Sequence, residues 1–337
     1  MKEIVFVDKN TARLCDVPCP EVTGDLVKVK TMVSTISCGT ERANLSGNPN
    51  VNGAAGAESM THYFPRTLGY SSAGVVEEIG PDVTSVKPGD RVVVYWGKHR
   101  EYNVMPEENV VRIENEAVSF EDAAIAFIAS FPLAAVRKTR VEAGEPALVM
   151  GLGILGQLAV QLLRASGAVP VVAVDPVEDR RKMAEAFGAD ASADPLAPDF
   201  AETVKKLTGG GAKACVEVTG LGKGLDQALD CMARFGRVAL LGCTRNSDFT
   251  IDYYRKVHFP GITLIGAHTM ARPDHESSAG WFTHRDDIQT VLKLAAGKRI
   301  RLKDMVRETH KPEECFEVYS RLVTDRNFPV VVQFDWR

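Results

Sequence analysis

The stretch from residue 147 to residue 175 contains glycines at the spacing of a dinucleotide-binding turn. Gly151, Gly153 and Gly156 fit the pattern G-x-G-x-x-G, with an apolar strand before them and a helix after them. The first glycine permits a tight turn, the second lets the backbone approach a pyrophosphate, and the third lets the helix pack against the strand. The N–H groups at the start of the helix would bind the phosphates. The pattern therefore predicts a site for a dinucleotide cofactor.

Asp175 ends the strand that follows this helix. A carboxylate in that position accepts hydrogen bonds from the ribose hydroxyls of adenosine and repels a 2′-phosphate, so NAD is the expected cofactor. Arg180 and Arg181, at the start of the next helix, are the opposing observation, because guanidinium groups bind phosphates. They also suit a solvent-exposed helix face. NADP is therefore kept as the second choice.

The sequence pattern changes near residue 119 and divides the chain into two kinds of predicted structure. Before residue 119, short segments rich in Val and Ile alternate with turn signals such as "GPDV" and "KPGD", which predicts a β domain. After it, apolar strands alternate with helical segments, which is typical of a doubly wound parallel sheet. The expected strands, all of them apolar and buried, are "PALVMG", "VPVVAVD", "KACVEVTG", "RVALLGC" and "ITLIGAH". The last apolar segment, "FPVVVQF", lies far from this series and is expected to return to the β domain.

Composition limits the classes of function. A chain of 337 residues, 45% of them hydrophobic, can form two packed domains. The net charge of −4 comes from intermixed acidic and basic residues, which argues against binding to nucleic acid or to a membrane surface. The N-terminus has no long apolar region and no apolar run reaches membrane-spanning length, so a cytoplasmic location is expected. The seven cysteines never form C-x-x-C and are expected to be reduced thiols.

Further stretches carry a second signal. They are "SCGTERANLSG" (37–47), "LGYSSAGVVEEIGPDVTSVKPGDRVVV" (68–94), "EYNVMPEENVVRI" (101–113), "FGADASAD" (187–194), "CVEVTG" (215–220) and "GRVALLG" (236–242). With the glycine pattern, they resemble the medium-chain dehydrogenase/reductase superfamily, which contains zinc alcohol and polyol dehydrogenases and zinc-free relatives. The resemblance covers nearly the full length and implies an NAD(P)-dependent oxidoreductase.

The resemblance also implies a domain plan and a cofactor site. The fold class is α/β, with a GroES-like substrate domain at residues 1–128, to which residues 270–337 return, and a Rossmann domain at residues 129–269. The predicted cofactor-binding residues are Gly151, Gly153, Ile154, Leu155, Gly156, Asp175, Arg180, Thr219, Gly242 and Ala267.

Zinc members of the superfamily hold their catalytic metal with a Cys, a His-Glu pair and a later Cys or acidic residue. By resemblance, Cys38 matches the first ligand and Thr40 matches the hydroxyl residue that passes on the substrate's proton, but Tyr70 and Ser71 stand at the His-Glu pair. The third ligand would fall near Ile128, and the four-cysteine lobe of many zinc members is absent. A zinc site needs three or four protein donors, so no metal ligands are predicted. The alternative is an irregular site assembled from Cys38 with Glu41, His62 or His99.

Hydride transfer without a metal needs a side-chain acid or base, because charge develops on the substrate oxygen. Tyr70 is the first candidate, and the alternative is that its ring fills the space of the missing ligand. Thr40 either orients the substrate and relays a proton or stabilises a turn. Glu41 and Arg42 are expected to form an ion pair, either behind the site or on the surface.

Histidines in two loops are weaker candidates. His268 follows the last strand of the nucleotide domain, where it either acts as an acid or base or has a structural role. The loop residues Lys98, His99 and Arg100 are expected to form a solvated rim or an interface first, and an anion clamp for an acidic substrate second. Among the other histidines of the segment 266–287, neither His275 nor His284 belongs to a metal-binding pattern.

The expected function is hydride transfer between NAD and a secondary alcohol, polyol or ketone, with Thr40, Tyr70, Cys38 and His268 as catalytic residues. One alternative is a zinc-free enoyl or quinone reductase, which reduces a conjugated C=C bond. A second is an NAD-binding protein whose catalytic site has decayed. The expected partners are a small alcohol or ketone and further copies of the chain, in a homodimer or homotetramer joined through apolar edge strands.

Overall fold

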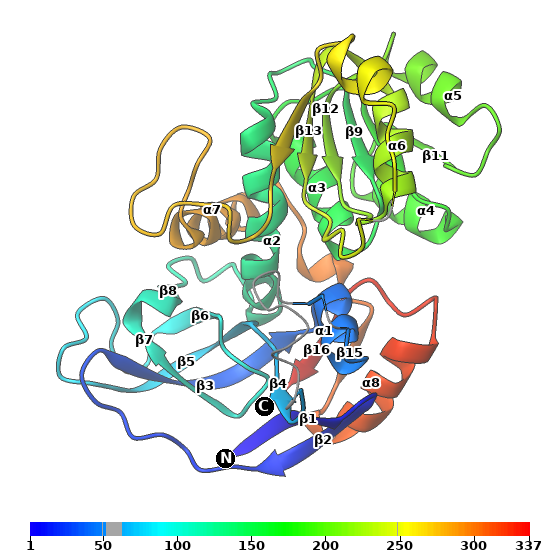
Figure 1. Cartoon of the computed structure of the whole chain (residues 1–337). Coiled ribbons are helices and arrows are strands. Elements are labelled where there is room, and N and C mark those ends of the chain that lie inside the picture. The colour runs from blue at the N-terminus through cyan, green and yellow to red at the C-terminus, as the bar shows by residue number, and fades with distance from the viewer. Residues whose placement is uncertain (49, 52–62, 248) are drawn as a thin grey trace. The chain divides into compact units, whose positions relative to one another are not determined.

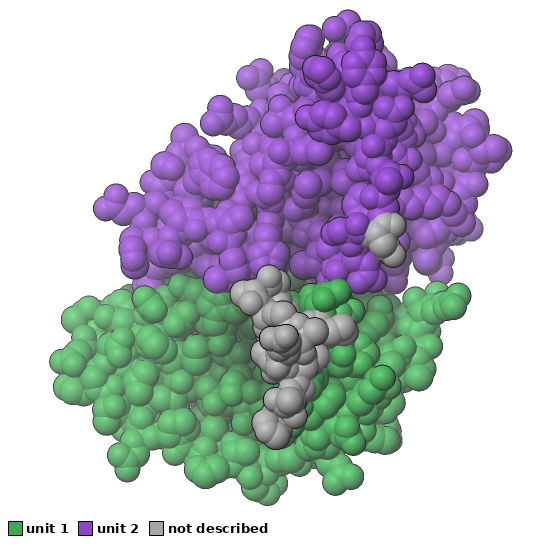
Figure 2. All heavy atoms as spheres, in the orientation of Figure 1, with its two compact units in different colours: residues 1–128, 288–337 green, residues 129–287 purple. Residues whose placement is uncertain are grey.

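The computed structural model describes residues 1–48, 50–51, 63–247 and 249–337, which are drawn in Figure 1. They form two compact units, shown in different colours in Figure 2. Unit 1 comprises residues 1–128 and 288–337, and unit 2 comprises residues 129–287. Residues 270–287, which the sequence assigned to the returning segment, group with unit 2. Both boundaries fall inside helices, α2 (Phe120–Thr139) and α7 (His284–Ala296).

Unit 1 is built mainly from β-strands, as its Val-rich segments predict. Within the described residues, its larger sheet has the order β15-β16-β3-β5-β6-β8, with β7 also paired to β3, and its smaller sheet has the order β2-β1-β4. The strands are β1 Lys2–Asp8, β2 Thr11–Asp16, β3 Leu26–Thr35, β4 Arg66–Thr67, β5 Ser71–Ile79, β6 Arg91–Tyr95, β7 Tyr102–Pro106, β8 Val110–Arg112, β15 Glu308–His310 and β16 Val332–Asp335.

Alternating burial explains why these segments form strands. In β3 the side chains of Val27 and Val29 are buried, whereas Lys30 is exposed. Val92 and Val94 of β6 belong to the same buried cluster. Side chains of a strand point alternately to its two faces, so this spacing gives the sheet one apolar face.

The helices of unit 1 connect the two ends of the chain. Helix α1 (Cys38–Leu45) contacts helix α8 (Cys315–Thr324), and both border a core that contains Phe6, Tyr319 and Phe334 (Figure 1). Strand β16 runs antiparallel to β3, with Phe334 opposite Ser34. The C-terminal segment thus brings its side chains to the start of α1. The short helices are η2 Glu107–Asn109, η4 Lys303–Met305 and η5 Pro312–Glu314.

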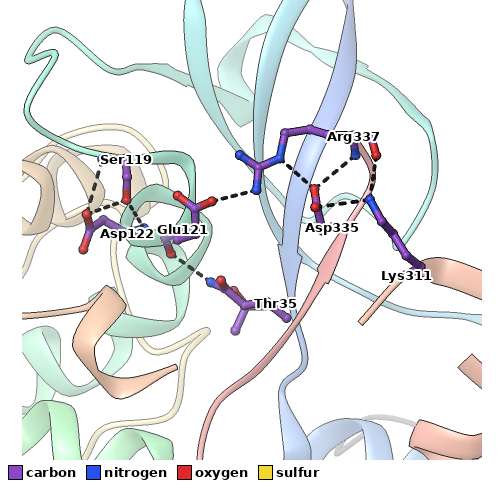
Figure 3. Close-up of polar contacts among 8 residues, drawn as sticks. Thr35, Ser119, Glu121, Asp122, Lys311, Asp335 and Arg337 are labelled. Carbon is purple, nitrogen blue, oxygen red and sulfur yellow. Dashed lines mark hydrogen bonds and ion pairs between the residues drawn. The ribbon is translucent and has the colours of Figure 1, made fainter. Parts of the chain in front are cut away.

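Polar contacts tie the C-terminus to the beginning of α2, as Figure 3 shows. The Arg337 guanidinium donates to Glu121 Oε1 at 2.8 Å and to Asp335 Oδ1 at 2.7 Å. Lys311 Nζ donates to Asp335 Oδ2 at 3.3 Å and to the Arg337 carbonyl at 2.7 Å. These contacts hold the end of β16 beside the start of α2.

Unit 2 contains a parallel sheet of order β11-β10-β9-β12-β13-β14. Its strands are β9 Ala147–Met150, β10 Val171–Val174, β11 Ala191–Ala193, β12 Ala212–Glu217, β13 Met232–Leu240 and β14 Thr263–Gly266. Its other helices are α3 Ile154–Ala165, α4 Glu178–Ala186, α5 Phe200–Leu207, α6 Gly222–Asp230 and the π-helix η3 Tyr254–His258. The strand order reverses direction beside β9, and this confirms the predicted doubly wound sheet.

One expectation about this sheet is wrong. The segment 262–268 was expected to be a buried strand, but β14 is the last strand in the order, and Thr263 and Leu264 are exposed. Apolar composition alone does not separate an edge strand from a central one, because only the tertiary structure decides which edges are covered. In the described part of the chain, no helix combines the length and apolar character needed to cross a membrane.

Candidate active site

The first turn of α1 carries Cys38 and Thr40, both half-buried. Ser37 occupies the N-cap position, but its side chain makes no capping hydrogen bond. Instead, Glu41 reaches back one turn, and its Oε1 accepts the Ser37 N–H at 2.8 Å. This contact satisfies the N-cap N–H as the Glu of a capping box would, although Glu41 stands one position later than that motif places it. The Ser37 hydroxyl is therefore not used by the helix.

The Tyr70 phenol contacts the Ser37 hydroxyl, which makes no capping bond to the helix. Its O–H donates a hydrogen bond to Ser37 Oγ. The Tyr70 ring is half-buried and meets two aromatic rings edge to face, Trp96 at 5.7 Å and Phe127 at 5.6 Å between centroids. The structure thus brings Tyr70 to the start of the helix that contains Cys38 and Thr40, and aromatic packing holds its ring in place.

Glu41 lies behind this turn in a fully buried position, and three groups face its carboxylate. The Tyr319 hydroxyl donates to Oε2 at 2.6 Å, the Ser37 N–H donates to Oε1, and His99 Nε2 lies 3.2 Å from Oε2. Burial raises the pKa of Tyr319 well above its usual value, and the nearby Glu41 charge raises it further. Tyr319 therefore remains a hydrogen-bond donor over the working pH range. The carboxylate is saturated by groups of unit 1.

Two expectations about these polar residues are wrong. Glu41 does not pair with Arg42, whose Nε donates to the Leu322 carbonyl at 2.7 Å. His99 and Arg100 do not form a solvated rim, because their exposed fractions are 1% and 9%. A charged or polar side chain is buried when the fold supplies partners for it, and those partners come from distant parts of the sequence.

The donors near Cys38 do not suit a tetrahedral zinc ion. The oxygens of Glu41 are occupied by the three groups described above, and the buried Ser71 hydroxyl donates to the Ala124 carbonyl at 2.7 Å. Cys38 Sγ lies 3.9 Å from the carbonyl oxygens of Ile36 and Pro329. Among the described residues, no three His, Cys, Asp or Glu side chains are grouped to hold a metal. His62, part of the alternative irregular site, lies outside the described residues.

The glycine pattern forms the turn between β9 and α3 in unit 2. Gly151 has a φ of 98°, a conformation that L side chains rarely adopt, and a Cβ on Gly156 would meet the Gly151 carbonyl oxygen at 1.9 Å. Gly153 is exposed, and a Cβ there would meet nothing within 4 Å. Ile154 and Leu155 open α3, whose N-cap residue has no side chain to occupy the N–H groups. The start of α3 therefore has no capping side chain, as in turns where helix N–H groups bind phosphate.

Asp175 lies at the end of β10 and is buried. Its Oδ2 accepts the Leu152 N–H and its Oδ1 accepts the Val177 N–H, each at 2.9 Å. Arg180 Nη1 lies 3.7 Å from Asp175 Oδ2, and Arg181 Nη1 donates to the Asp175 carbonyl at 2.6 Å. The carboxylate is rigidly oriented, while one of the two arginines that could contact a 2′-phosphate already faces it.

The remaining predicted residues of unit 2 lie at the carboxyl ends of β12, β13 and β14. Thr219 donates its N–H to the buried Glu217 Oε1 at 2.7 Å, and a Cβ on Gly242 would meet Gly220 N at 2.4 Å. Burial raises the pKa of Glu217. Ala267 is buried, but its neighbour His268 is exposed. His268 Nδ1 accepts the Met270 N–H at 3.2 Å, which leaves the ring proton on Nε2 when the imidazole is neutral.

Sequence reasoning did not identify Ser37 and Tyr319 as part of the site. Ser37 is the first residue of the recognised segment 37–47 but was given no role, and Tyr319 lies 278 residues after its partner Glu41. No local pattern in the sequence links those residues. The capping-box pattern does not mark Ser37 either, because Glu41 lies four residues after it and that pattern needs a Glu or Gln three residues after the cap.

Comparisons with known proteins agree with this geometry. Residues 25–115 match the family model described as "Alcohol dehydrogenase GroES-like domain", and residues 155–285 match "Zinc-binding dehydrogenase". The chain is 28% identical to an L-threonine 3-dehydrogenase of Pyrococcus horikoshii, over 90% of either chain. It is 28% identical to a D-guloside 3-dehydrogenase of Escherichia coli, over 71% of this chain and 68% of that protein. The crystal structure of 2R,3R-butanediol dehydrogenase from Bacillus subtilis matches with a TM-score of 0.82 and 23% identity, over 99% of both chains.

Proposed function

The chain belongs to the medium-chain dehydrogenase/reductase superfamily, and we propose that it transfers a hydride between a nicotinamide cofactor and a secondary alcohol, polyol or ketone. The proposal includes a mechanism without catalytic zinc and a preference for NAD. Relatives named as threonine and guloside dehydrogenases support the reaction class. One observation carries the zinc-free mechanism: the Tyr70 phenol is bonded to Ser37 at the start of the helix that contains Cys38 and Thr40.

Each unit contributes one part of this chemistry. The bound nicotinamide would supply or accept the hydride, and the Gly151–Gly156 turn with Asp175 in unit 2 would hold the cofactor. In unit 1, Tyr70 would act on the substrate oxygen. During reduction of a ketone, its O–H bond breaks and the proton passes to the substrate oxygen, while the bonding pair stays on the phenolate. In oxidation, the phenolate takes the proton back.

Cys38, Thr40 and His268 have smaller roles in the proposal. Thr40 is a poor base without assistance, so it would orient the substrate hydroxyl from the first turn of α1. Cys38 would be a small apolar neighbour in the same turn. His268 would be a second acid or base in unit 2, with its proton on Nε2.

Trp96 supports a substrate that has an apolar face as well as hydroxyl groups. Its side chain is 37% exposed and its φ is 60°, which is uncommon for a bulky residue. The ring packs against Phe127 at 4.9 Å and against Tyr70. An exposed aromatic ring beside the Tyr70 phenol would offer both apolar and polar contacts to a polyol or a glycoside.

Metal analysis together with a substrate panel tests the proposal. We expect substoichiometric zinc, turnover that survives chelation, and faster NADH oxidation with ketones than with an enone or a quinone. Stoichiometric zinc whose removal abolishes turnover would contradict the zinc-free mechanism. Preferred reduction of the enone or quinone would support the reductase alternative. NAD binding without turnover of any substrate would support a decayed catalytic site.

The cofactor preference is measured in the same assay. Asp175 supports NAD, since its carboxylate is buried and oriented by two N–H groups. NADPH turnover equal to NADH turnover would contradict the preference, and it would assign Arg180 to the 2′-phosphate.

A further inference from the structure

The Ser37 hydroxyl points to the Tyr70 phenol and not to the N–H groups of α1. Ser37 is 7% exposed, its N–H is bound by Glu41, and its Oγ accepts the Tyr70 O–H. A serine at an N-cap usually turns its oxygen toward the N–H groups of the helix. Here the oxygen makes no such bond. Its direction toward Tyr70 is therefore set by the Glu41 contact and by the phenol.

Glu41 is itself held by a chain of donors that begins at the C-terminal segment. The Trp336 indole N–H donates to Ser34 Oγ at 2.9 Å, and Ser34 Oγ lies 2.7 Å from His99 Nδ1. An indole nitrogen only donates, so the Ser34 hydroxyl accepts a hydrogen bond from Trp336. Its own O–H can then donate a hydrogen bond to His99 Nδ1. His99 then carries its hydrogen on Nε2 and directs it at Glu41.

Each donor in this network points toward the Glu41 carboxylate, either directly or through the next residue. His99 and Glu41 have exposed fractions of 1% and 0%, so water does not compete for these bonds. Tyr319 completes the set from α8. Buried networks in which each donor has an acceptor hold their members in one arrangement. The network consequently fixes the backbone of Ser37, from which the side chain reaches the Tyr70 hydroxyl.

We propose that Ser37 is the positioning residue for Tyr70, and that the buried Glu41 network holds Ser37 in register for that task. This inference rests on the proposed function, in which Tyr70 exchanges a proton with the substrate. A serine hydroxyl rotates, so the same Oγ can accept from the neutral phenol and donate to the phenolate. When Tyr70 gives its proton to a ketone oxygen, the Ser37 O–H turns and donates to the phenolate. Water then returns a proton to Tyr70, and Ser37 accepts again.

A double-mutant cycle tests the proposal. Replacing Ser37 by Ala (S37A) removes a hydrogen bond to a charged oxygen, so we expect kcat for ketone reduction to fall about tenfold to hundredfold. The KM for the ketone and the Kd for NADH should change less than about twofold, because neither is bound by Ser37. Ser37→Thr keeps the hydroxyl and should recover most of the lost rate.

The decisive measurement is S37A in a Tyr70→Phe background. If Ser37 acts only through the Tyr70 hydroxyl, S37A should cause no further loss of kcat there. Ser46→Ala is the matched control, since Ser46 lies at the other end of α1 and its Oγ donates to the Ala43 carbonyl at 3.2 Å. It should leave kcat unchanged. Circular dichroism and denaturation midpoints verify that each variant is folded.

The outcomes separate this inference from the proposed function. An equal loss of kcat on S37A in both backgrounds overturns the inference, as does an unchanged kcat in the S37A variant when Tyr70→Phe alone lowers kcat about 100-fold. In both cases the proposed function stands. Near-normal turnover of the Tyr70→Phe variant instead contradicts the proton step of the proposed function, and the positioning role is then rejected with it.

Discussion

The Tyr319 hydroxyl donates a 2.6 Å hydrogen bond to Glu41 Oε2, although 278 residues separate the two in the sequence. This bond joins α8 to α1 inside unit 1, at a point closed to water. It belongs to the same network that fixes Ser37, so the stability of the C-terminal segment and the geometry of the candidate active site depend on the same residues.

Removal of the Glu41 carboxylate should destabilise unit 1. Glu41→Ala leaves the Ser37 N–H, the Tyr319 O–H and His99 Nε2 without their acceptor in a buried site, at a cost of about 3 kcal/mol. The urea denaturation midpoint should fall accordingly. Glu116→Ala, at an exposed position, is the control and should change nothing. An unchanged midpoint for Glu41→Ala would show that the network does not stabilise the fold.

Tyr70→Phe keeps the aromatic packing against Trp96 and Phe127 but removes the acidic proton. We expect kcat to fall about 100-fold, since that is the usual contribution of a general acid. NAD binding should be unchanged because the glycine turn lies in unit 2. Stopped-flow NADH oxidation and a fluorescence titration measure the two quantities. If kcat stays within about twofold of the parent, Tyr70 only fills space.

Asp175→Asn removes the charge that would repel a 2′-phosphate, and Arg180 Nη1, now 3.7 Å from Asp175 Oδ2, loses its anionic neighbour. The ratio of kcat/KM for NADPH to that for NADH should rise about tenfold or more. Asp179→Asn removes an exposed acid on α4 and should leave the ratio unchanged. A constant ratio in both variants would show that Asp175 does not select the cofactor.

His284 makes unit 2 sensitive to acid. Burial, together with the charge of Arg272, lowers the pKa of His284 to about 3, whereas an unfolded histidine titrates near 6.5. The unfolded chain therefore binds the proton first, and stability is lost as pH falls from about 6.5 toward 3. Burial raises the pKa of Asp287 to about 6 despite Arg137 and Arg272, and this acts in the opposite direction between about 6 and 4.

His284→Gln isolates the first of these contributions. The variant should lose less stability than the parent between pH 7 and pH 4.5, as measured by denaturant midpoints at both values. His275→Gln, at an exposed position of the same segment, is the control and should behave like the parent. If both variants lose as much stability as the parent, His284 does not cause the acid sensitivity.

We propose that a second copy of the chain pairs with β14. This strand ends the sheet order, and exposed aromatic rings lie near it: Phe235 and Phe259 are 67% and 65% exposed, and the Arg234 guanidinium lies 5.5 and 5.6 Å from their centroids. Leu264→Lys places a charge on the strand, which opposes edge pairing. It should convert a dimer to a monomer in light scattering, whereas Leu196→Lys, at another exposed position, should not.

The doubly wound sheet and the glycine turn could be predicted from the sequence because both depend on local periodicity and on backbone conformations open only to glycine. The mismatch at Tyr70 and Ser71 was equally visible, since it concerns residue types at known spacing. These features need only neighbouring residues for their explanation.

The tertiary structure decided which polar groups are buried together. The sequence analysis expected His99 in a solvated loop and Glu41 in an ion pair with Arg42. They meet instead inside unit 1, because β16 and α8 return to β3 and α1. A polar side chain is buried only where distant segments supply hydrogen-bond partners. The sequence gives the types of those residues but not which of them meet. The residue types at the candidate site can therefore be identified from the sequence. The network that holds Ser37 beside Tyr70 forms only in the folded chain.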